Sequence, residues 1–457
     1  MILLIINIGF DSIDTPKGGC TTHFVSLLLK EWIKKKNIDL IDYPNLIRLN
    51  PAIPWKTRGN GAVALRLKTS DENKAIDYYE DAIVFLDSYL KEYSKNWTEH
   101  GDPSISIYIG DPVENKLLKW FSEKSLYDYI TIDLVEKILD KINGLTKYFF
   151  LKSKRGLIGC LSSIGYRMIN TDYTYELIVY RREEYFGTNR RVDVNSILLM
   201  DKLFSDNTIL NYDYEENRPL IIPHGPDPVL LGIRGEEPDT LFKALSVLKI
   251  EEPLSLIVVF RTNQHTDAHL KKINDLREVY PYRSVRVEAT VYSKPIRLIG
   301  GHVFFQVSDN YRVVDIMVYE PTGYLRNIVE KLNPGDYVEV MGSVRPPSFK
   351  HHMCINLEKI HVIDVKPIIV YENPKCPKCG TRMTSAGRKK GFKCTHCKYR
   401  SKEIGKVVKV IERDLKPGWY EPPPRAFKHL MKPLKRFNRE KNSFPTVFKP
   451  IDFIVIH

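Results

Sequence analysis

The sequence predicts an α+β chain of several domains, and three observations support this fold class. The 457 residues exceed what one hydrophobic core fills and suggest about three to four domains. Strand-like and helix-like patterns alternate up to about residue 280, and five short strand-like runs follow at regular spacing. Two Cys-x-x-Cys pairs come next. We expect an α/β domain (1–150), a ferredoxin-type domain (151–280), an OB-fold β-barrel (281–367), a cysteine ribbon (368–405) and a basic tail (406–457).

The first domain is organised around one loop between a strand and a helix. Ile2–Ile8 has the length and branched content of a buried strand, and Phe24, Leu27, Leu28 and Trp32 repeat at helical spacing. The loop between them, Gly9–Thr22, holds two aspartates (Asp11 and Asp14), adjacent glycines (Gly18 and Gly19) and adjacent threonines (Thr21 and Thr22).

Two interpretations of this loop are equally compatible with its residues. Backbone N–H groups and the helix dipole favour an anion at the N-terminus, with carboxylates holding a hard cation beside it. The loop lacks both G-x-x-x-x-G-K-[ST] and G-x-G-x-x-G, so it matches no standard phosphate signature. The alternative is a polar turn with Thr21 or Thr22 as the N-cap.

A second, cationic loop follows in the same domain. Lys56, Arg58, Gly59 and Asn60 lie in one loop, and glycine there lets the backbone approach a ligand closely. Alone, such a loop is usually an exposed hairpin; paired with the acidic loop, it supplies the cationic half of a nucleotide–metal site. Thr69–Glu72 then resembles a capping box that opens a helix to about residue 93, and a further helical stretch covers 114–142.

The third domain has the element order of an OB-fold. Five strand-like runs and a helical stretch before the fourth strand are expected at 284–292, 302–308, 313–319, 322–332 (the helix), 336–344 and 355–365. OB-folds commonly bind single-stranded nucleic acid on aromatic side chains. The aromatic residues of these strands are as compatible with the barrel core as with such a platform.

The cysteine pairs predict a metal centre. Cys376 and Cys379 are separated by fourteen residues from Cys394 and Cys397. Four thiolates at this spacing close a tetrahedral, structural Zn²⁺ site, and a disulfide pair is the competing interpretation.

The charge is concentrated at the C-terminal end. Residues 375–457 carry 22 Lys/Arg against 6 Asp/Glu, whereas the first 374 residues carry 47 against 50. This asymmetry indicates a polyanionic partner such as RNA. We expect RNA contacts from Arg388, Lys389 and Lys390 in the ribbon, and from Lys428, Lys432, Lys435 and Arg436 in the tail. The alternative for the tail is a helix on the body with a solvated basic face.

The composition argues against a membrane protein. No apolar run approaches the ~20 residues of a membrane span. The first eight residues lack a basic n-region and are therefore not expected to be a signal peptide. We expect a cytoplasmic monomer.

Several blocks of the sequence resemble the archaeal tRNA(Ile) 2-agmatinylcytidine synthetase family. The most specific is Arg48–Pro51 with Ile53–Val63, which reads R-L-N-P and I-P-W-K-T-R-G-N-G-A-V. The others are Gly18–Thr22, Gly156–Gly159, Asp227–Gly235 and His265–Asp267. The expected domain order also agrees with the family, whose first domain is kinase-like.

The resemblance implies an ATP-dependent ligase acting on tRNA(Ile2). Such enzymes transfer the γ-phosphoryl group of ATP to O2 of the wobble cytidine, replace that oxygen by agmatine and release AMP, so that the anticodon reads AUA instead of AUG. It implies that Thr21 positions or accepts phosphate and that Asp11 and Asp14 carry Mg²⁺. Lys56 and Arg58, with Gly18, Gly19, Thr22, Gly59 and Asn60, would bind the phosphates.

One position departs from the family. Its loop reads G-I-D-D-T-D-S, whereas this chain has Ser12 in place of an aspartate and Ile13 in place of a threonine. We expect that Asp11 and Asp14 suffice for the metal. The resemblance places agmatine on the ferredoxin-like domain, where Asp172 and Glu176 are candidate carboxylates and could equally be solvated strand residues.

Two other classes of function are compatible with parts of the chain. One is a nucleic-acid-binding protein without chemistry, which leaves the paired acidic and basic loops unexplained. The other is a small-molecule kinase, which does not need the barrel, ribbon and basic tail.

Overall fold

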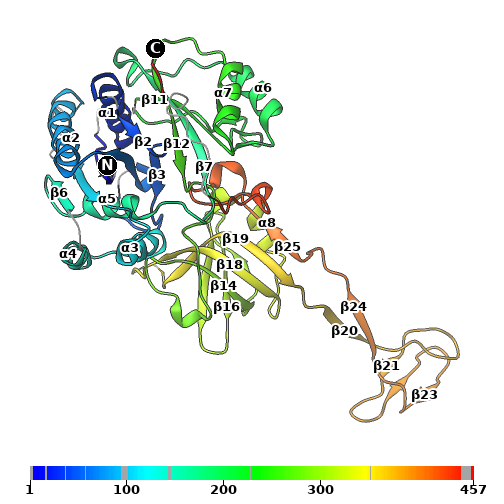
Figure 1. Cartoon of the computed structure of the whole chain (residues 1–457). Helices are drawn as coiled ribbons and strands as arrows, with labels where there is room; N and C mark the ends of the chain where they lie inside the picture. Colours follow the sequence, from blue (N-terminus) through cyan, green and yellow to red (C-terminus); the bar gives the residue numbers. More distant parts are fainter. Residues whose placement is uncertain are drawn as a thin grey trace.

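One mixed β-sheet carries both predicted N-terminal domains (Figure 1). The structure is a computed structural model and describes residues 4–15, 18–36, 38–56, 58–93, 101–142, 146–226, 228–349, 351–443 and 454–456. None of the helices in these ranges combines the length and apolar character needed to cross a bilayer.

The first half of the sheet has the strand order β6-β5-β1-β4-β3. Its elements are β1 (Leu4–Asp11), α1 (Thr21–Lys36), β2 (Asp39–Leu40), β3 (Asn45–Arg48), β4 (Gly61–Thr69), α2 (Glu72–Tyr93), β5 (Ser104–Ile109), α3 (Lys116–Tyr127), α4 (Ile132–Lys141), β6 (Thr146–Phe150) and α5 (Gly156–Gly165). The predicted first strand and the helix ending at residue 93 are confirmed, while the stretch 114–142 is two helices. Asp71, rather than Thr69, accepts the hydrogen bond from the Lys74 amide at the start of α2 (2.9 Å).

Helix α5 lies unusually close to the first strand. A Cβ on Gly9 would come within 2.4 Å of the Cys160 carbonyl oxygen, and one on Gly159 within 2.2 Å of the Asp11 carboxylate. Only glycine permits this approach, which seats the end of β1 against the first turn of α5.

The second half of the sheet is antiparallel, with the order β12-β7-β11-β8. It comprises β7 (Thr174–Arg181), α6 (Val194–Phe204), β8 (Thr208–Ile209), a small hairpin of β9 (Tyr212–Asp213) and β10 (Arg218–Pro219), β11 (Val229–Gly235), α7 (Pro238–Val247) and β12 (Leu254–Thr262). Strand β3 pairs in parallel with β12 through Asn45–Arg261 and Leu46–Thr262, so the two halves form one sheet of eleven strands. We call this junction the seam.

A five-stranded barrel follows the sheet. Its elements are β14 (Ser284–Val291), β16 (Val303–Ser308), β17 (Val313–Val318), α8 (Tyr324–Val329), β18 (Tyr337–Arg345) and β19 (Cys354–Asp364). The order β14-β18-β19-β17-β16 closes through a β14–β16 pairing. Every predicted strand of this region is present, and the short strands β13 (Lys271–Lys272), β15 (Ile296–Arg297) and β25 (Gly418–Tyr420) extend its edges.

The cysteine ribbon projects from the barrel on a two-stranded stem (Figure 1). The stem pairs β20 (Ile368–Glu372) with β24 (Val407–Ile411), and the ribbon holds β21 (Thr384–Ser385), β22 (Phe392–Lys393) and β23 (Arg400–Ser401). The second stem strand therefore comes from the segment expected to begin the tail.

The rest of the tail corrects the prediction of a basic helix. Residues 424–443 contain two 3-10 turns, Pro424–Ala426 and Leu434–Arg436, and no α-helix. Prolines interrupt the segment, which lies across the body instead. Arg436 is fully buried, with Nη1 3.0 Å from Asp172 and Nε 2.6 Å from Glu236.

The other three tail cations expected to contact RNA also have partners within the protein, although Lys428 and Lys435 are partly accessible. Lys428 pairs with Glu358 (2.7 Å), Lys432 pairs with Glu440 (2.8 Å), and Lys435 donates to the Thr208 carbonyl (2.6 Å). The expectation that Arg436 contacts RNA is wrong because no face of its guanidinium reaches solvent. These side chains fasten the tail to the sheet and the barrel.

We predict that Arg436→Met destabilises the whole protein. The substitution keeps the bulk of the side chain but leaves two buried carboxylates short of a partner, which costs about 3 kcal/mol. Differential scanning calorimetry should show a clearly lower unfolding midpoint than for Arg439→Met, an exposed neighbour whose loss costs ~0.5 kcal/mol or less. Equal midpoints for the two variants would contradict the assigned role.

Candidate nucleotide site and metal centre

Hydrogen bonds tie the described residues of the opening loop to one another and to α2. The Gly19 amide donates to Thr15 Oγ1 (2.8 Å), and that hydroxyl donates to the Tyr93 carbonyl on α2 (3.0 Å). The Tyr89 hydroxyl, also on α2, accepts from the Cys20 amide (3.1 Å). Gly18 has φ 122°, a conformation that glycine adopts without strain. Gly18 and Gly19 thus shape the loop.

The threonines do not cap α1 in the way the turn interpretation expected. The helix begins at Thr21, so Thr21 and Thr22 lie in its first turn, and Phe24 donates to the Cys20 carbonyl (2.9 Å). Thr21 Oγ1 instead accepts from the Ile13 amide (3.2 Å) and ties the loop back on itself. The backbone N–H groups at the start of α1 therefore face a cavity that Thr21 and Thr22 line.

Two cavities flank the loop. The first, of about 250 Å³, lies at the seam, and we call it the seam cavity. The second, of about 290 Å³, lies between the loop, the cationic loop and α3, and we call it the aromatic cavity. The seam cavity is lined by Asp14, Thr21, Thr22, Arg48, Gly59, Glu176, Arg234 and His429; the aromatic cavity by Asp11, Ser12, Trp55, Lys56, Asn60, Asp102, Asp128, Tyr129 and Arg155, among others.

The lining of the seam cavity is suited to binding an anion. The side chains of Arg48 and Arg234 are 13% and 16% exposed and share one carboxylate, Glu176, at 3.8 and 3.0 Å. Arg48 Nε is buried and has no hydrogen-bond partner among the described residues. These two cations balance the two carboxylates of the lining, Glu176 and Asp14, and the first turn of α1 adds the partial positive charge of its amides.

The histidine in this cavity is neutral. The charge of Arg48, together with burial, holds the pKa of His429 well below its usual value. Its Nδ1 lies 3.1 Å from Gln264 Oε1. His429 is therefore a hydrogen-bonding group and adds no positive charge to the cavity near pH 7.

Half-buried Asp11 is the distinctive group of the aromatic cavity. Burial is the largest cause that raises its pKa to about 8, and Asp14 and Asp102 add to the increase. The hydrogen bond from the Ser12 amide (2.7 Å) opposes it. Without a cation beside it, this carboxyl is protonated near neutral pH.

The structure divides the predicted phosphate and metal residues between the cavities. Asp14, Thr21, Thr22 and Gly59 line the seam cavity, while Asp11, Lys56 and Asn60 line the aromatic cavity. The side chain of Arg58 lies outside the described part of the chain. Sequence reasoning missed Arg48, Arg234 and His429 as site residues, although the first two stand inside the blocks that carry the family resemblance.

The two candidate agmatine carboxylates have different surroundings. Asp172 lines neither cavity, and its carboxylate pairs with Arg436 (3.0 Å) and Lys432 (3.5 Å). Its charge is balanced by these two cations, and its role in binding agmatine stays a prediction. Glu176 does line the seam cavity. Burial raises its pKa, but Arg234 and Arg48 outweigh that effect, and the pKa is lowered overall.

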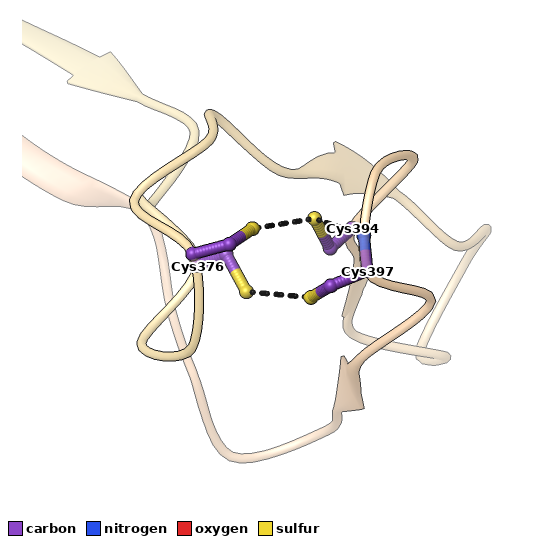
Figure 2. A group of neighbouring side chains, drawn as sticks. Cys376, Cys394 and Cys397 are labelled. Atoms are coloured by element: carbon purple, nitrogen blue, oxygen red, sulfur yellow. Dashed lines mark hydrogen bonds between the residues drawn. The ribbon is translucent and has the colours of Figure 1, made fainter.

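The four ribbon cysteines form a metal site. Their Sγ atoms all lie within 4.8 Å of one another, and all four are free thiols. Figure 2 shows Cys376, Cys394 and Cys397 turned toward one another from two facing loops, and the Sγ atoms of Cys376 and Cys397 are 3.4 Å apart. Tetrahedral Zn²⁺ with ~2.3 Å bonds fits this set and would leave no open coordination position. The zinc interpretation is favoured over the disulfide one.

The ribbon also carries the accessible basic cluster. Arg388, Lys389 and Lys390 are exposed in the turn between β21 and β22, and Lys389 adopts a left-handed φ of 60°. A cavity suited to an anion, an exposed basic cluster and a Cys₄ ribbon are together typical of a multidomain protein that binds a polynucleotide.

Comparisons with known proteins identify the family. The TiaS TCKD domain family matches residues 7–149, the TiaS FLD domain family matches residues 154–269, and the TiaS C-terminal zinc ribbon domain family matches residues 373–415. A tRNA(Ile2) 2-agmatinylcytidine synthetase TiaS of Staphylothermus marinus is 58% identical over 452 residues, covering 98% of this chain and 97% of that protein. The one of Pyrococcus horikoshii is 40% identical and covers 94% of this chain and 97% of that protein.

Solved structures agree. The crystal structure of a TiaS-tRNA(Ile2)-ATP complex is similar with a TM-score of 0.80 and 36% identity, covering 97% of this chain and 100% of that one. A TiaS-tRNA(Ile2)-AMPCPP-agmatine complex gives a TM-score of 0.78 and 34% identity with the same coverage. This chain belongs to the tRNA(Ile2) 2-agmatinylcytidine synthetase (TiaS) family.

Removal of one ribbon thiol should release the metal. We expect the purified wild-type protein to hold one Zn²⁺ per chain and Cys379→Ser to lose most of it, because three thiolates leave the tetrahedral site open. Elemental analysis after gel filtration measures this. Cys354→Ala, in the barrel, is the control and should keep its zinc; unchanged metal content in Cys379→Ser would refute the site.

The buried Asp11 should make stability depend on pH. Its pKa is raised in the folded state to about 8, so the stability that its protonated form supports is complete below about pH 4 and is lost as pH rises through 8. Asp11→Asn, measured in EDTA by thermal unfolding, should match the wild type near pH 4 and exceed its midpoint at pH 9. A constant difference between pH 4 and 9 would contradict the raised pKa.

Proposed function

We propose that this protein conjugates agmatine to C2 of the wobble cytidine of tRNA(Ile2) in an ATP-dependent reaction. The observation that carries this proposal is the 58% identity to a TiaS over 98% of the chain. Similar structures hold tRNA(Ile2) with ATP, and with AMPCPP and agmatine. The product anticodon would read AUA instead of AUG.

The polyphosphate of ATP binds in the seam cavity. Arg48 and Arg234 supply two fixed cations, and the first turn of α1 supplies amides beside Thr21 and Thr22. The unpaired Nε of Arg48 is a donor that a phosphate oxygen would satisfy. The apolar side chains of Leu46, Ile178 and Val229 line the same cavity and suit the adenine ring.

Thr21 and Asp14 act on the transferred phosphoryl group. Both line the seam cavity, next to the cations that would hold it. Mg²⁺ held by Asp14 and Asp11 would neutralise charge on the phosphates, and its presence would also keep Asp11 ionised. The γ-phosphoryl group passes to O2 of cytidine, the primary amine of agmatine attacks C2, and phosphate leaves with that oxygen as the amine loses a proton. Release of the nucleotide as AMP requires a second cleavage, in which water takes the β-phosphoryl group.

Glu176 is the carboxylate we assign to agmatine. Both candidate carboxylates are paired with arginines, but Glu176 lines the seam cavity and Asp172 lines neither cavity. Lys56 and Asn60, at the inner wall of the aromatic cavity, stay candidate phosphate contacts, with Arg58 and Gly59 in the same loop.

The domain roles follow from topology and charge. The order 4-1-3-2 of β12, β7, β11 and β8, all antiparallel, supports a ferredoxin-like domain, and the closed barrel with parallel β17–β19 pairing supports an OB-fold. We propose a kinase-like, ATP-binding first domain (1–150) and RNA contacts through the barrel and the Arg388–Lys390 turn. The division at 150, 280, 367 and 405, a cytoplasmic location and a monomeric state belong to the same proposal.

Transfer of radiolabelled agmatine tests the function directly. Label should enter a tRNA(Ile2) transcript only with ATP present and only when position 34 is cytidine. Asp14→Ala should abolish ATP cleavage, and Thr21→Ala should abolish label transfer while ATP still binds; we expect at least 100-fold loss in each, in line with about 10²–10³ for one stabilising group. Thr69→Ala, on β4 away from both cavities, is the control.

Two outcomes would decide against the proposal. tRNA binding without any label transfer would indicate an RNA-binding protein that lacks this chemistry. ATP cleavage that is independent of tRNA, with phosphate moving to a small molecule, would indicate a kinase of another class.

A further inference from the structure

The C-terminal tail contributes a histidine to the seam cavity. His429 lines this cavity together with Thr21 of the opening loop and with Glu176 and Arg234 of the second half of the sheet. The residue is half-buried, and its Nε2 receives no hydrogen bond from the described part of the chain. A ring nitrogen without a partner, inside the cavity assigned to ATP and agmatine, is a candidate for a role in the reaction.

The hydrogen bonds behind the ring fix its tautomer. Glu176 is ionised near neutral pH, because Arg234 and Arg48 outweigh the effect of burial on its pKa, and an ionised carboxylate can only accept. Gln264 therefore turns its side-chain nitrogen to Glu176 Oε2 and its oxygen to His429 Nδ1, which lies 3.1 Å away. Since that oxygen accepts, Nδ1 carries the proton and Nε2 keeps its lone pair.

A glycine leaves room beside Nε2. Gly59, on the cationic loop, has a left-handed φ of 67°. A Cβ at this position would come within 3.1 Å of His429 Nε2 and within 2.5 Å of Arg48 Nη1. Any side chain at position 59 would therefore crowd the ring, and glycine keeps the Nε2 edge within reach of a ligand.

The tail is aligned along the loop that follows β12, and this alignment places the ring. The carbonyls of His429 and Leu430 accept from the amides of His265 and Asp267, both at 2.8 Å. His265 Nδ1 also donates to the Met431 carbonyl (3.0 Å). His265 and Asp267 have left-handed φ values of 58° and 60°, which cost backbone energy in residues other than glycine. The contacts with the tail offset this cost and hold His429 against the seam.

The charges around the ring keep Nε2 free of a proton before substrates bind. The charge of Arg48 is the largest cause that holds the pKa of His429 well below its usual value, followed by burial and by the charges of Arg234, His265 and Lys56. These groups come from β3, β11, the loop after β12 and the cationic loop. Together they leave the ring neutral, with its lone pair available.

A bound nucleotide changes this balance. Asp14, Glu176 and the thiol of Cys20 also line the cavity, but they leave the pKa of His429 low. A polyphosphate beside Arg48 adds several negative charges, which raise the pKa of the ring toward its usual range. Nε2 therefore becomes an effective proton acceptor when the nucleotide site is occupied.

The proposed reaction needs such an acceptor. The nitrogen of agmatine carries an extra proton once its lone pair has formed the bond to C2, and this proton has to leave as the C2–O bond breaks. Glu176, the carboxylate assigned to agmatine, and His429 are bound to opposite ends of the Gln264 amide. An amine in the seam cavity therefore shares the cavity with an imidazole whose lone pair is free.

We propose that His429 is a catalytic residue, and that its Nε2 accepts the proton that the agmatine amine loses as it joins C2 of the cytidine. This inference rests on the proposed function for the identity of the nucleophile. The lone pair of the neutral amine forms the C2–N bond, an N–H bond breaks and leaves its electrons on nitrogen, and the proton moves to Nε2. The electrons of the C2–O bond leave with phosphate, and the imidazolium returns its proton to water after product release.

Replacement of the ring tests this role by its chemistry. His429→Asn keeps a donor in the place of Nδ1–H and removes the acceptor at Nε2. We expect single-turnover transfer of agmatine to fall about 100-fold or more. Transfer of hydroxylamine should stay close to wild type, because its weakly basic nitrogen gives up the proton to water without a base. His361→Asn, on β19 and outside both cavities, is the control and should transfer both amines normally.

The outcomes separate failure of this role from failure of the reaction. Equal losses with agmatine and hydroxylamine would indicate that the ring is structural, and unchanged agmatine transfer in His429→Asn would show that no proton passes to it. Either result rejects the role of His429 alone. Absence of transfer to tRNA(Ile2) by the wild-type protein rejects the proposed function itself.

Nitrogen NMR tests the ring without requiring turnover. The full chain is labelled with ¹⁵N at its 12 histidines, and the signal that His429→Asn removes is assigned to this ring. We expect a neutral imidazole with its proton on Nδ1, and a pKa that rises when AMPCPP is added. A proton on Nε2 in the free protein, or a pKa that AMPCPP leaves unchanged, would overturn the proposal.

Discussion

The seam between β3 and β12 is the constraint on which the site depends. Only two residue pairs align there in parallel, yet the junction is reinforced by buried polar groups. Arg261, fully buried, pairs with Asp42, its Nε 3.1 Å from Asp42 Oδ1. The Asn263 side chain bonds both backbone groups of Arg48, at 2.8 and 2.9 Å. Because an unpaired charge here would cost about 3–5 kcal/mol, the two halves of the sheet cannot separate cheaply. Arg48 of the first half is thereby fixed beside Arg234 of the second.

The basic residues of the C-terminal part fall into two groups: some form ion pairs within the protein, and others are exposed. The C-terminal excess of basic residues suggested one long RNA-binding surface. However, Lys428, Lys432 and Arg436 of the tail form ion pairs with carboxylates of the protein. The cluster Arg388–Lys390 remains exposed on the ribbon. An exposed basic cluster therefore lies at the far end of the stem, while the paired cations of the tail fasten it to the sheet and the barrel. Position along the chain did not reveal this division, since the acidic partners lie between 70 and 264 residues away from these cations, or, for Glu440, on the same tail.

Local patterns predicted the elements well and the contacts between them poorly. Periodicity or spacing within a short segment is enough to predict strand β1, helices α1 and α2, the five barrel strands and the Cys₄ group. The tail helix failed because tertiary partners, with Pro433, outweighed its apolar spacing. The site was predicted in part: Asp14 and Thr21 do share a cavity. Arg48 and Arg234 were missed because their proximity is created by the seam, which no local pattern encodes.

The position of Ser12 bears on the missing carboxylate of the loop. Ser12 has a left-handed φ of 59° and lines the aromatic cavity, whereas Asp14 lines the seam cavity. An aspartate at position 12 would thus add its charge on the side where Asp11 and Asp102 already repel each other. Serine there reduces that repulsion, and the carboxylate nearest the proposed phosphates, Asp14, is retained. The loop therefore lacks a charge on the side of the aromatic cavity and keeps Asp14 on the side of the seam cavity.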